Sequence, residues 1–403
     1  MALLSTPELR ARAKSLPGVS SLLDALGSEH PQSVFLVGGA VRDLLLEREP
    51  LDLDLAVDGS LGELTQRLEG TPEIHDRFGT ATVTREAVRY DIAQTRAERY
   101  AEPGALPEVR PAPILEDLQR RDFTVNAIAL GLTGPQAGEL IAVDGALEDL
   151  EARRLEVLHD ESFVDDPTRL LRLARYAARL GFTIAPHTRE LAAAAVANGA
   201  LATVSGPRIG NELRLLAAES DPVTGFAVLS QLGLDGAIDK SLAFGEERQQ
   251  LARAALAELP SDGSPAIVVL GVALLGREPG AATALLDRLE FTAADREAIV
   301  DVGRASRLNE ALESASTGSD VARAIGNAGV ATVALAAAQV PSWRHQQWLQ
   351  TLRHQKLQIT GDDLIEAGIK EGPELGRRLA KVQDAVWDGS APDRESQLKV
   401  ALA

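Results

Sequence analysis

Residues 34–55, VFLVGGAVRDLLLEREPLDLDL, decide the fold of the N-terminal part of the chain. The apolar run 34–37 predicts a buried strand. Gly38 and Gly39 follow it, and a Gly-Gly pair at the end of a strand indicates unusual torsion angles or a close approach of the backbone to another group. A helical stretch containing Arg42 comes next. The segment therefore predicts a strand, a glycine turn, a helix and a second strand.

The second strand carries two acidic residues, Asp52 and Asp54, that alternate with leucines. Residues i and i+2 of a strand share a face, so the two carboxylates are expected on the same side, about 7 Å apart along the chain. Carboxylates held side by side repel each other, and a divalent cation is the usual reason for such a pair. Nearby glycine amides would suit phosphate oxygens. Alone, the Gly-Gly pair is typical of a simple turn, and the acidic pair of a solvent-facing strand.

Composition places the chain among globular proteins. It has 403 residues, 45% of them apolar and 25% charged, and it has no cysteine. Disulfides, thiolate metal sites and thiol catalysis are therefore excluded. No signal peptide or membrane-spanning stretch is apparent, and a cytoplasmic protein is expected.

The net charge of −18 argues mildly against a nucleic-acid partner. The charge is uneven, however, because residues 341–403 hold nine basic and nine acidic residues, and the whole acidic excess lies before them. A basic surface can coexist with this overall charge.

The pattern of apolar residues predicts an α+β fold with two unlike parts. Residues 6–28 resemble one amphipathic helix, and strands are expected at 34–37, 51–57, 80–85, 88–95 and 125–130. From about residue 148 onward, Ala- and Leu-rich helical periods dominate. The sequence predicts a mixed head followed by a long helical body.

A second distinctive segment is Arg120-Arg121-Asp122-Phe123-Thr124-Val125-Asn126-Ala127. Arg120 and Arg121 can neutralise triphosphate charge, and Asp122 can accept a hydrogen bond from a ribose 2′-hydroxyl. Asn126 offers both a donor and an acceptor. The alternative is a salt bridge on a helix surface.

Four motifs occur in a fixed order: GGAVRD, LDLDL, RRDFTVNAIA and DDPTRLLRLARYAARLGF. Together they resemble the class II nucleotidyltransferases, which comprise the tRNA CCA-adding enzymes and the bacterial poly(A) polymerases. The resemblance covers residues 33–215. It implies a polymerase-β-like head at 1–147, a helical neck at 148–217, a helical body at 218–338 and a helical, tRNA-binding tail at 339–403.

The resemblance also implies residue roles. Asp52 and Asp54 are expected to bind Mg²⁺ and to be catalytic, and Asp91 is expected as the third carboxylate, although an exposed strand Asp is the alternative. In-line phosphoryl transfer is implied, with one metal at the RNA 3′-hydroxyl and one at the pyrophosphate. The residues expected to bind the nucleotide are Gly38, Gly39, Arg42, Arg121, Asp122, Asn126, Asp165, Asp166, Arg169 and Arg172.

The segment Asp165–Arg169 resembles the family's base-selecting motif, with Asp in place of the usual Glu at the first position. Asp166 only accepts hydrogen bonds and Arg169 only donates them. Cytosine and adenine each present an amino donor beside a ring-nitrogen acceptor, whereas uracil and guanine present the reverse. One Asp/Arg pair can therefore admit CTP and ATP and exclude UTP and GTP. The simpler alternative is a helix start with favourably placed acids.

The loop and tail complete the functional hypothesis. The resemblance associates a polar loop at 94–118 with the switch to adding A, and CC-only enzymes lack it. Residues 357–376 resemble the tail of bacterial CCA-adding enzymes. The residues expected to contact RNA are Arg175, Gly372, Arg377, Arg378 and Lys381.

We therefore expect an enzyme that adds CCA to the tRNA 3′ end from CTP and ATP, with Mg²⁺ as cofactor. Its expected partners are the acceptor and T arms of tRNA, and no membrane. The alternatives are an A-adding enzyme, a poly(A) polymerase, a silent RNA-binding protein on the same scaffold, and a nucleotidyltransferase for small molecules.

Overall fold

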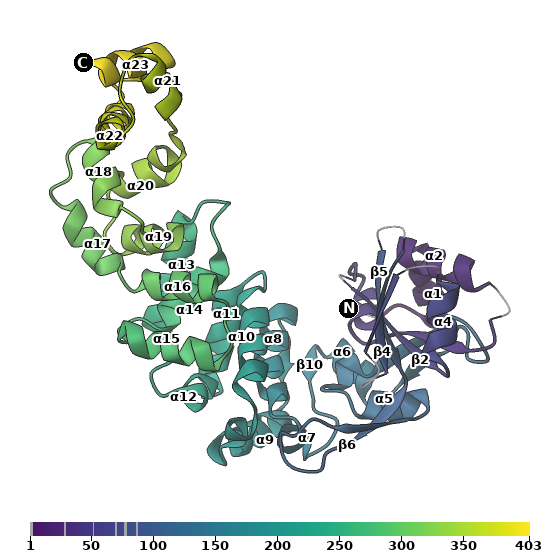
Figure 1. The fold of residues 1–403 in the computed structure, drawn as a ribbon. Coiled ribbons are helices and arrows are strands. Elements are labelled where there is room, and N and C mark those ends of the chain that lie inside the picture. Colours follow the sequence, from purple (N-terminus) through teal and green to yellow (C-terminus); the bar gives the residue numbers. More distant parts are fainter. Residues whose placement is uncertain (1–2, 28–29, 51, 69–70, 76–78, 86–87) are drawn as a thin grey trace. The chain divides into compact units, whose positions relative to one another are not determined.

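The computed structural model describes residues 3–27, 30–50, 52–68, 71–75, 79–85 and 88–403. Its contacts divide the chain into two units, residues 1–205 and 206–403 (Figure 1). The dividing point lies inside the predicted neck. The α+β fold class is confirmed, because the first unit contains a mixed sheet and the regular elements of the second, fully described unit are all helices.

Seven strands of the described residues form the main sheet of the first unit, in the order β3-β4-β5-β2-β1-β8-β9. Neighbouring strands are antiparallel except β2 and β5, which are parallel. The strands of this sheet are β1 (Ser33–Val37), β2 (Leu53–Asp58), β3 (Thr71–His75), β4 (Thr80–Arg85), β5 (Val88–Gln94), β8 (Ile128–Gly131) and β9 (Leu140–Ala142).

Helices and two small sheets complete the first unit. Helices α2 and α4 contact β5, and α5 contacts β8 and β9 (Figure 1). The helical elements of the first unit are α1 (Thr6–Ser15), α2 (Pro17–Leu26), α3 (Gly39–Leu45), α4 (Leu61–Arg67), α5 (Ile114–Gln119), η2 (Thr124–Asn126), α6 (Ala146–Glu151), α7 (Ser162–Asp165), α8 (Thr168–Leu180), α9 (Pro186–Ala197) and η3 (Ala200–Thr203). The small sheets pair β6 (Arg96–Arg99) with β7 (Glu108–Pro111), and β10 (Arg154–Leu155) with β11 (Thr183–Ile184).

The core of the head explains why β1 is central. All five residues of β1 are buried. Phe35 and Val37 pack with Ile114 and Leu118 of α5 and with neighbours on β2 and β8. Burial on both faces requires an uninterrupted apolar strand, which the sequence provides. This core fixes the end of β1, where the glycine turn begins.

Three predicted elements differ from the structure. The predicted helix 6–28 is two helices, because Leu16 is extended before Pro17, as the residue preceding a proline usually is. The predicted strand 125–130 begins as the 3₁₀ turn η2 and becomes β8 only at Ile128. The polar loop 94–118 contains the β6–β7 hairpin.

The second unit is built from helices with conventional caps. Capping boxes begin α18, α21 and α23 at Thr317, Thr360 and Asp393. The helices are α10 (Gly206–Ala217), α11 (Pro222–Gln231), α12 (Leu234–Ile238), α13 (Glu246–Glu258), α14 (Pro265–Ala273), α15 (Pro279–Arg288), α16 (Ala293–Val302), α17 (Ala305–Leu312), α18 (Gly318–Ile325), α19 (Val330–Gln339), α20 (Trp343–Gln350), η4 (Leu352–His354), α21 (Gly361–Glu366), α22 (Pro373–Trp387) and α23 (Arg394–Leu402).

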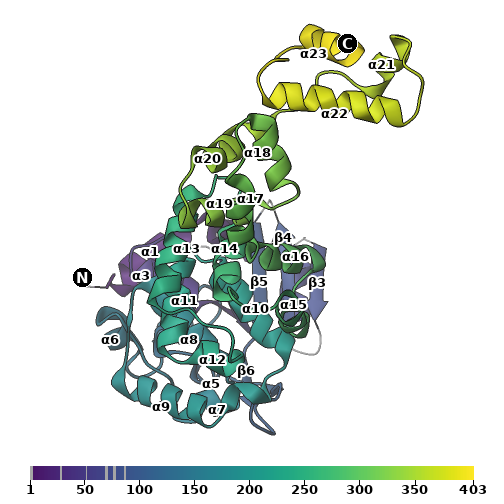
Figure 2. The same cartoon turned by 90° about the vertical axis from the view of Figure 1, so that its left-hand side faces the viewer.

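The last three helices have a small core of their own. Helices α21, α22 and α23 pack together (Figure 2) around Leu364, Val382 and Ala401. Among the described residues, no single helix has the length and apolar character needed to cross a membrane; α18 and α19 would reach that length only together, and they are bent by 110°.

Candidate active site

The glycine turn after β1 makes room for an arginine. Gly38 has φ +64°, and its amide donates to the Ile128 carbonyl at 2.9 Å. A Cβ atom at Gly38 would lie 2.7 Å from Nη1 of Arg121, whereas one at Gly39 would make only an ordinary contact with Arg42. The Gly38 amide is therefore occupied within the fold, contrary to the expectation that it awaits a phosphate. What Gly38 provides is space for the Arg121 guanidinium.

Arg121 lies where a triphosphate could use it. Its Nη2 bonds Asp117 at 3.0 Å, and its charge lowers the cost of ionising Asp54. Its Nε is buried, and no described residue accepts a hydrogen bond from it. A buried N–H without a partner is costly in a native fold, and a bound phosphate oxygen would satisfy it. The predicted role of Arg121 fits this geometry.

Three carboxylates, those of Asp52, Asp54 and Asp91, lie near one another on β2 and β5, which are neighbours inside the sheet. This group is called the carboxylate edge. Asp54 of β2 lies opposite Asp91 of β5 in the parallel ladder, and Asp52 immediately precedes β2. Asp54 keeps contact with solvent, yet the protein atoms crowding its carboxylate raise its pKa through desolvation. Arg121 opposes this rise, while the charges of Asp52 and Asp91 add to it. The pairing of β2 with β5 therefore holds acidic side chains close enough to repel each other.

The donor chemistry of this edge fits Mg²⁺, which prefers carboxylate oxygens and usually keeps several waters or phosphates as further ligands. Among the described residues, no group of three or more His, Asp or Glu side chains could hold a metal alone. One oxygen of Asp91 already accepts from Thr82 at 2.7 Å and from Arg89 at 3.1 Å. Asp52 and Asp54 therefore remain the predicted protein ligands, and the role of Asp91 stays a prediction.

Asp122 organises a buried network. Its Oδ1 accepts from the Phe123 amide and from Asn126 Nδ2, both at 2.9 Å, and its Oδ2 accepts from Arg172 Nε and Nη2 at 2.8 and 2.6 Å. Burial disfavours the charged form, but the Arg172 charge and these hydrogen bonds prevail and lower the pKa of Asp122 to about 2. With both oxygens engaged, Asp122 positions its neighbours in this structure, and its predicted contact with a ribose stays a prediction.

Arg42 and Asn126 are buried and bond each other inside the fold. Arg42 is buried and bonds Asp43 through Nε at 2.9 Å and Asn126 through Nη1 at 2.5 Å. Asn126 is buried and bonds Asp122 on its other side. Both side chains connect α3 to the segment after α5. Their direct contact with nucleotide stays a prediction.

The expected base-selecting pair is likewise engaged inside the protein. Asp166 Oδ1 accepts from the Thr168 amide at 3.1 Å and from its hydroxyl at 2.6 Å, which starts helix α8. Arg169 is buried and donates to Ser162 Oγ and to the Arg120 carbonyl, both at 2.7 Å. The helix-start interpretation is thus present, and Arg169 connects α8 to the head. Base selection by these residues stays a prediction.

The β6–β7 hairpin lies against the neck segment that contains Asp165. The Gly104 amide, between the two strands, lies 3.3 Å from the Val164 and Asp165 carbonyls. Gly104 has φ +72°, and a Cβ there would lie 2.2 Å from Thr203 Oγ1. Asp165 itself lies 4.0 Å from His159 and stays partly exposed. The region predicted as a polar loop is therefore docked, not free, near the expected base-selecting residues.

A buried acid that the sequence motifs do not include, Asp117, holds the arginine pair. Asp117 bonds Arg120 at 2.6 Å through Oδ1 and Arg121 at 3.0 Å through Oδ2. Burial opposes ionisation of Asp117, but the two arginines lower its pKa. Glu98 takes the remaining side of Arg120 at 2.7 Å. An acid four residues before an arginine on a helix was the available signal.

The predicted RNA contacts have mixed positions. Glu374 forms ion pairs with Arg377 at 2.8 Å and with Arg378 at 2.9 Å, so much of their charge is offset. Lys381 is exposed on the same helix, and Gly372 begins that helix with open space around its Cα. Arg175 of the neck is buried, contrary to the expectation of an RNA-facing side chain. Only part of the predicted set is presented to solvent.

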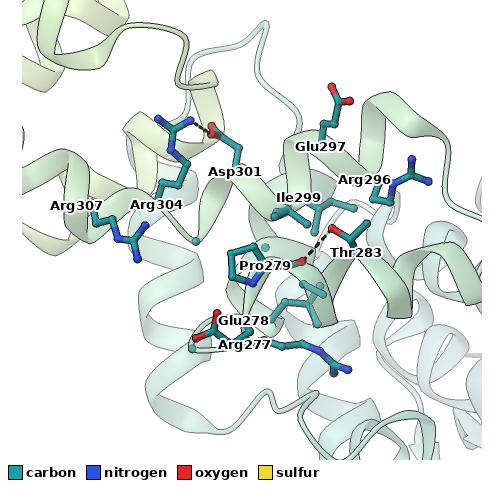
Figure 3. Close-up of a pocket in the computed structure, with 16 residues that line it drawn as sticks. Arg277, Glu278, Pro279, Thr283, Arg296, Glu297, Ile299, Asp301, Arg304 and Arg307 are labelled. Carbon is teal, nitrogen blue, oxygen red and sulfur yellow. Dashed lines mark hydrogen bonds and ion pairs between the residues drawn. The ribbon is translucent and has the colours of Figure 1, made fainter.

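A cavity of about 650 Å³ lies elsewhere, among α14 to α17 of the second unit (Figure 3). Arg304 and Arg307 lie on one side of it, and Arg304 is bonded to Asp301. It contains none of the predicted catalytic residues. The chemistry of the chain is therefore assigned to the carboxylate edge of the head and not to this cavity.

Comparison with known proteins identifies the family of the chain. The family model described as the poly A polymerase head domain matches residues 34–156. A CC-adding tRNA nucleotidyltransferase of Deinococcus radiodurans is 35% identical over 91% of this chain and 89% of its own length. The chain belongs to the tRNA nucleotidyltransferase family. The resemblance to class II nucleotidyltransferases is thereby confirmed.

Other members of the tRNA nucleotidyltransferase family differ in how much of their length the chain spans. An A-adding tRNA nucleotidyltransferase of Geobacter sulfurreducens is 32% identical over 96% of this chain, and the chain spans 47% of that relative. A solved CCA-adding enzyme matches 100% of this chain and 99% of its own with a TM-score of 0.80 at 28% identity. The CCA-adding enzyme of Thermotoga maritima in complex with tRNA_CCA matches with a TM-score of 0.74 at 27% identity.

The buried Asp122 generates a prediction about acid stability. Its pKa is lowered from 3.8 to about 2 on folding, so its contribution is complete above pH 4 and is lost between about pH 4 and 2. That contribution is about 2 kcal/mol. We expect Asp122→Asn to lower the free energy of unfolding near neutral pH, and we expect the difference from wild type to shrink as the pH falls through this window.

Urea unfolding measured from pH 6 to 2.5 checks this. The exposed Asp24→Asn variant is the matched control and should show no such change. A difference between wild type and Asp122→Asn that stayed constant over the whole range would contradict the assignment.

Proposed function

We propose that the protein is a tRNA nucleotidyltransferase that adds CCA to the tRNA 3′ end from CTP and ATP, without a nucleic-acid template. The observation that carries the proposal is the carboxylate edge of β2 and β5 beside Arg121, within a chain similar along its whole length to solved CCA-adding enzymes. Solved complexes of CCA-adding enzymes with ATP and with CTP are among these similar structures.

The reaction follows from the charges at this edge. The tRNA 3′-hydroxyl oxygen attacks the α-phosphorus, the bond to the bridging oxygen breaks, and pyrophosphate leaves while the hydroxyl proton is lost. Mg²⁺ held by Asp52 and Asp54 would favour the deprotonated hydroxyl and offset charge on the leaving group. Arg121, placed beside Gly38, would hold triphosphate oxygens. Asp117 keeps Arg121 in that orientation.

The proposal also specifies which nucleotides are added: two C residues followed by one A. The docked β6–β7 hairpin supports A addition, since the family resemblance associates a segment here with that step. Addition of CC alone is the second candidate, because the Deinococcus relative is CC-adding and is covered over 89% of its length. The A-adding relatives keep A addition alone as a third outcome.

One assay distinguishes these outcomes. Purified protein is incubated with tRNA ending in the discriminator base, in C, or in CC, and with each labelled nucleotide in turn. We expect C to be added to the first two substrates and A to the third. Addition of C alone, or of A alone, would replace the proposal by the corresponding partial activity. Incorporation into none of the substrates would contradict it.

The catalytic carboxylates generate a second prediction. Asp54→Asn and Asp52→Asn each remove one negative ligand without changing the size of the side chain. We expect incorporation to fall by at least about a thousandfold, since a misplaced metal costs several kcal/mol of transition-state stabilisation. Binding of tRNA should be retained.

Primer extension is measured beside a filter-binding titration. Asp58→Asn, an exposed residue at the far end of the same strand, is the matched control and should extend tRNA like wild type. Extension by Asp54→Asn at the wild-type rate would remove Asp54 from the site.

The base-selecting pair generates a third prediction. The double variant Asp166→Ala with Arg169→Ala is expected to use all four nucleotides poorly but more evenly, since UTP and GTP would no longer meet a mismatched pair. Single-nucleotide incorporation with each NTP is the measurement.

A control for the double variant is a substitution at Ser162, whose hydroxyl accepts a hydrogen bond from Arg169. Ser162→Ala removes the hydroxyl that Arg169 bonds but leaves the guanidinium, so it should alter stability and not base choice. A double variant that stays active and rejects UTP and GTP as well as wild type would return these residues to a purely structural role.

A further inference from the structure

One aromatic ring in the neck is surrounded by three arginines. Tyr176 of α8 has the guanidinium carbons of Arg175, Arg172 and Arg42 at 5.0, 5.5 and 5.7 Å from its ring centre. Phe123 meets the same ring edge-on, with a centroid distance of 6.0 Å. The ring thus connects α8, α3 and the segment that follows α5.

The arrangement concentrates positive charge that must be offset. Arg42 is offset by Asp43 at 2.8 Å, and Arg172 by Asp122 at 2.6 Å. The negative face of an aromatic ring adds about 0.5–2 kcal/mol for each well-placed cation, with the larger values at desolvated sites. A planar guanidinium can also stack on a ring, which limits its orientation more than a carboxylate alone does. Tyr176 therefore restrains the arginines as well as stabilising them.

Arg172 is the member of this group that reaches the active site. It bonds the buried carboxylate of Asp122, the residue that directly follows Arg121 in the chain. The solvent-exposed fraction of the Arg172 side chain is 31%, so an incoming nucleotide can reach it. The Tyr176 hydroxyl lies 3.4 Å from Arg172 Nη2. Tyr176 thus contacts Arg172 on one side and Asp122 binds it on the other.

We propose that Tyr176 is a positioning residue for nucleotide binding, which acts by holding the Arg172 guanidinium in place against Asp122, the residue that follows Arg121. This inference rests on the proposed function. The ring does the positioning, since the 3.4 Å contact of the hydroxyl is too long to be strong. Loss of the ring lets Arg172 leave this orientation, which weakens nucleotide binding more than it slows the chemical step.

The test uses the full-length chain and four variants: Tyr176→Phe, Tyr176→Leu, Arg172→Gln, and the last two combined. Binding of CTP and of ATP with Mg²⁺ is measured by calorimetry, and KM and kcat by single-nucleotide incorporation into tRNA. Tyr176→Phe keeps the ring and is the matched control. We expect it to bind within about twofold of wild type, whereas Tyr176→Leu should raise Kd and KM about tenfold, the effect of one cation–π contact, with kcat nearly unchanged.

The double variant separates positioning from a general structural role. If Tyr176 acts through Arg172, Tyr176→Leu adds little to the loss already caused by Arg172→Gln. Equal binding by wild type and Tyr176→Leu, full additivity in the double variant, or a Tyr176→Phe defect as large as that of Tyr176→Leu would each overturn the inference. If the wild-type protein binds nucleotide, the binding measurements test the role of Tyr176 whichever nucleotides the protein adds to tRNA. If the wild-type protein binds neither CTP nor ATP, this inference and the proposed function are both overturned.

Discussion

Repulsion among carboxylates at the edge of β2 and β5 is the constraint on which the rest of the head depends. The parallel register of β2 and β5 places Asp54 opposite Asp91, and the next residues of both strands, Leu55 and Ile92, are buried. Desolvation and the neighbouring acids both raise the pKa of Asp54. Arg121 and Arg172 oppose that rise from two different segments. Contacts in the surrounding structure hold the Arg121 and Arg172 guanidinium groups in place.

Each of the two arginines is positioned by a buried acid. Asp117 orients Arg121, for which Gly38 leaves space, and Asp122 orients Arg172. Buried carboxylates are tolerated because they are paired and hydrogen-bonded, and the lowered pKa of each reflects this. Removing one partner would leave an uncompensated buried charge, which is more costly than the pair is stabilising. Among the charged residues near the site, Arg121 and Arg172 are the proposed nucleotide contacts, and Asp117 and Asp122 hold these arginines in place.

The sequence predicted the elements well where one physical signal dominated. The apolar run of β1, the glycine turn and the alternating acids of β2 were visible because each follows a simple period. The break at Pro17 was also visible but was outweighed by helical periodicity. The strand β3 was not predicted, because Pro72 argues against a strand, and an edge position tolerates it.

Side-chain roles were harder to predict, because burial depends on contacts distant in sequence. Arg42 and Asn126 belong to motifs that suggest nucleotide contacts, yet they bond each other across 84 residues of chain inside the fold. Arg169 is buried for the same kind of reason. Tyr176 directly follows the predicted site residue Arg175, but only the fold brings Arg42 to its ring. Residue type and spacing predicted the segments of the site, and packing decided which side chains face outward.

The central claim is that the repelling carboxylates form a cation site completed by a nucleotide. Titration with Mn²⁺ followed by electron paramagnetic resonance, with and without CTP, tests it directly. The account predicts weak Mn²⁺ binding alone, binding at least about tenfold tighter with CTP because phosphates supply further oxygen ligands, and loss of the tight site in Asp54→Asn. Mn²⁺ binding that is unaffected by both CTP and Asp54→Asn would contradict it.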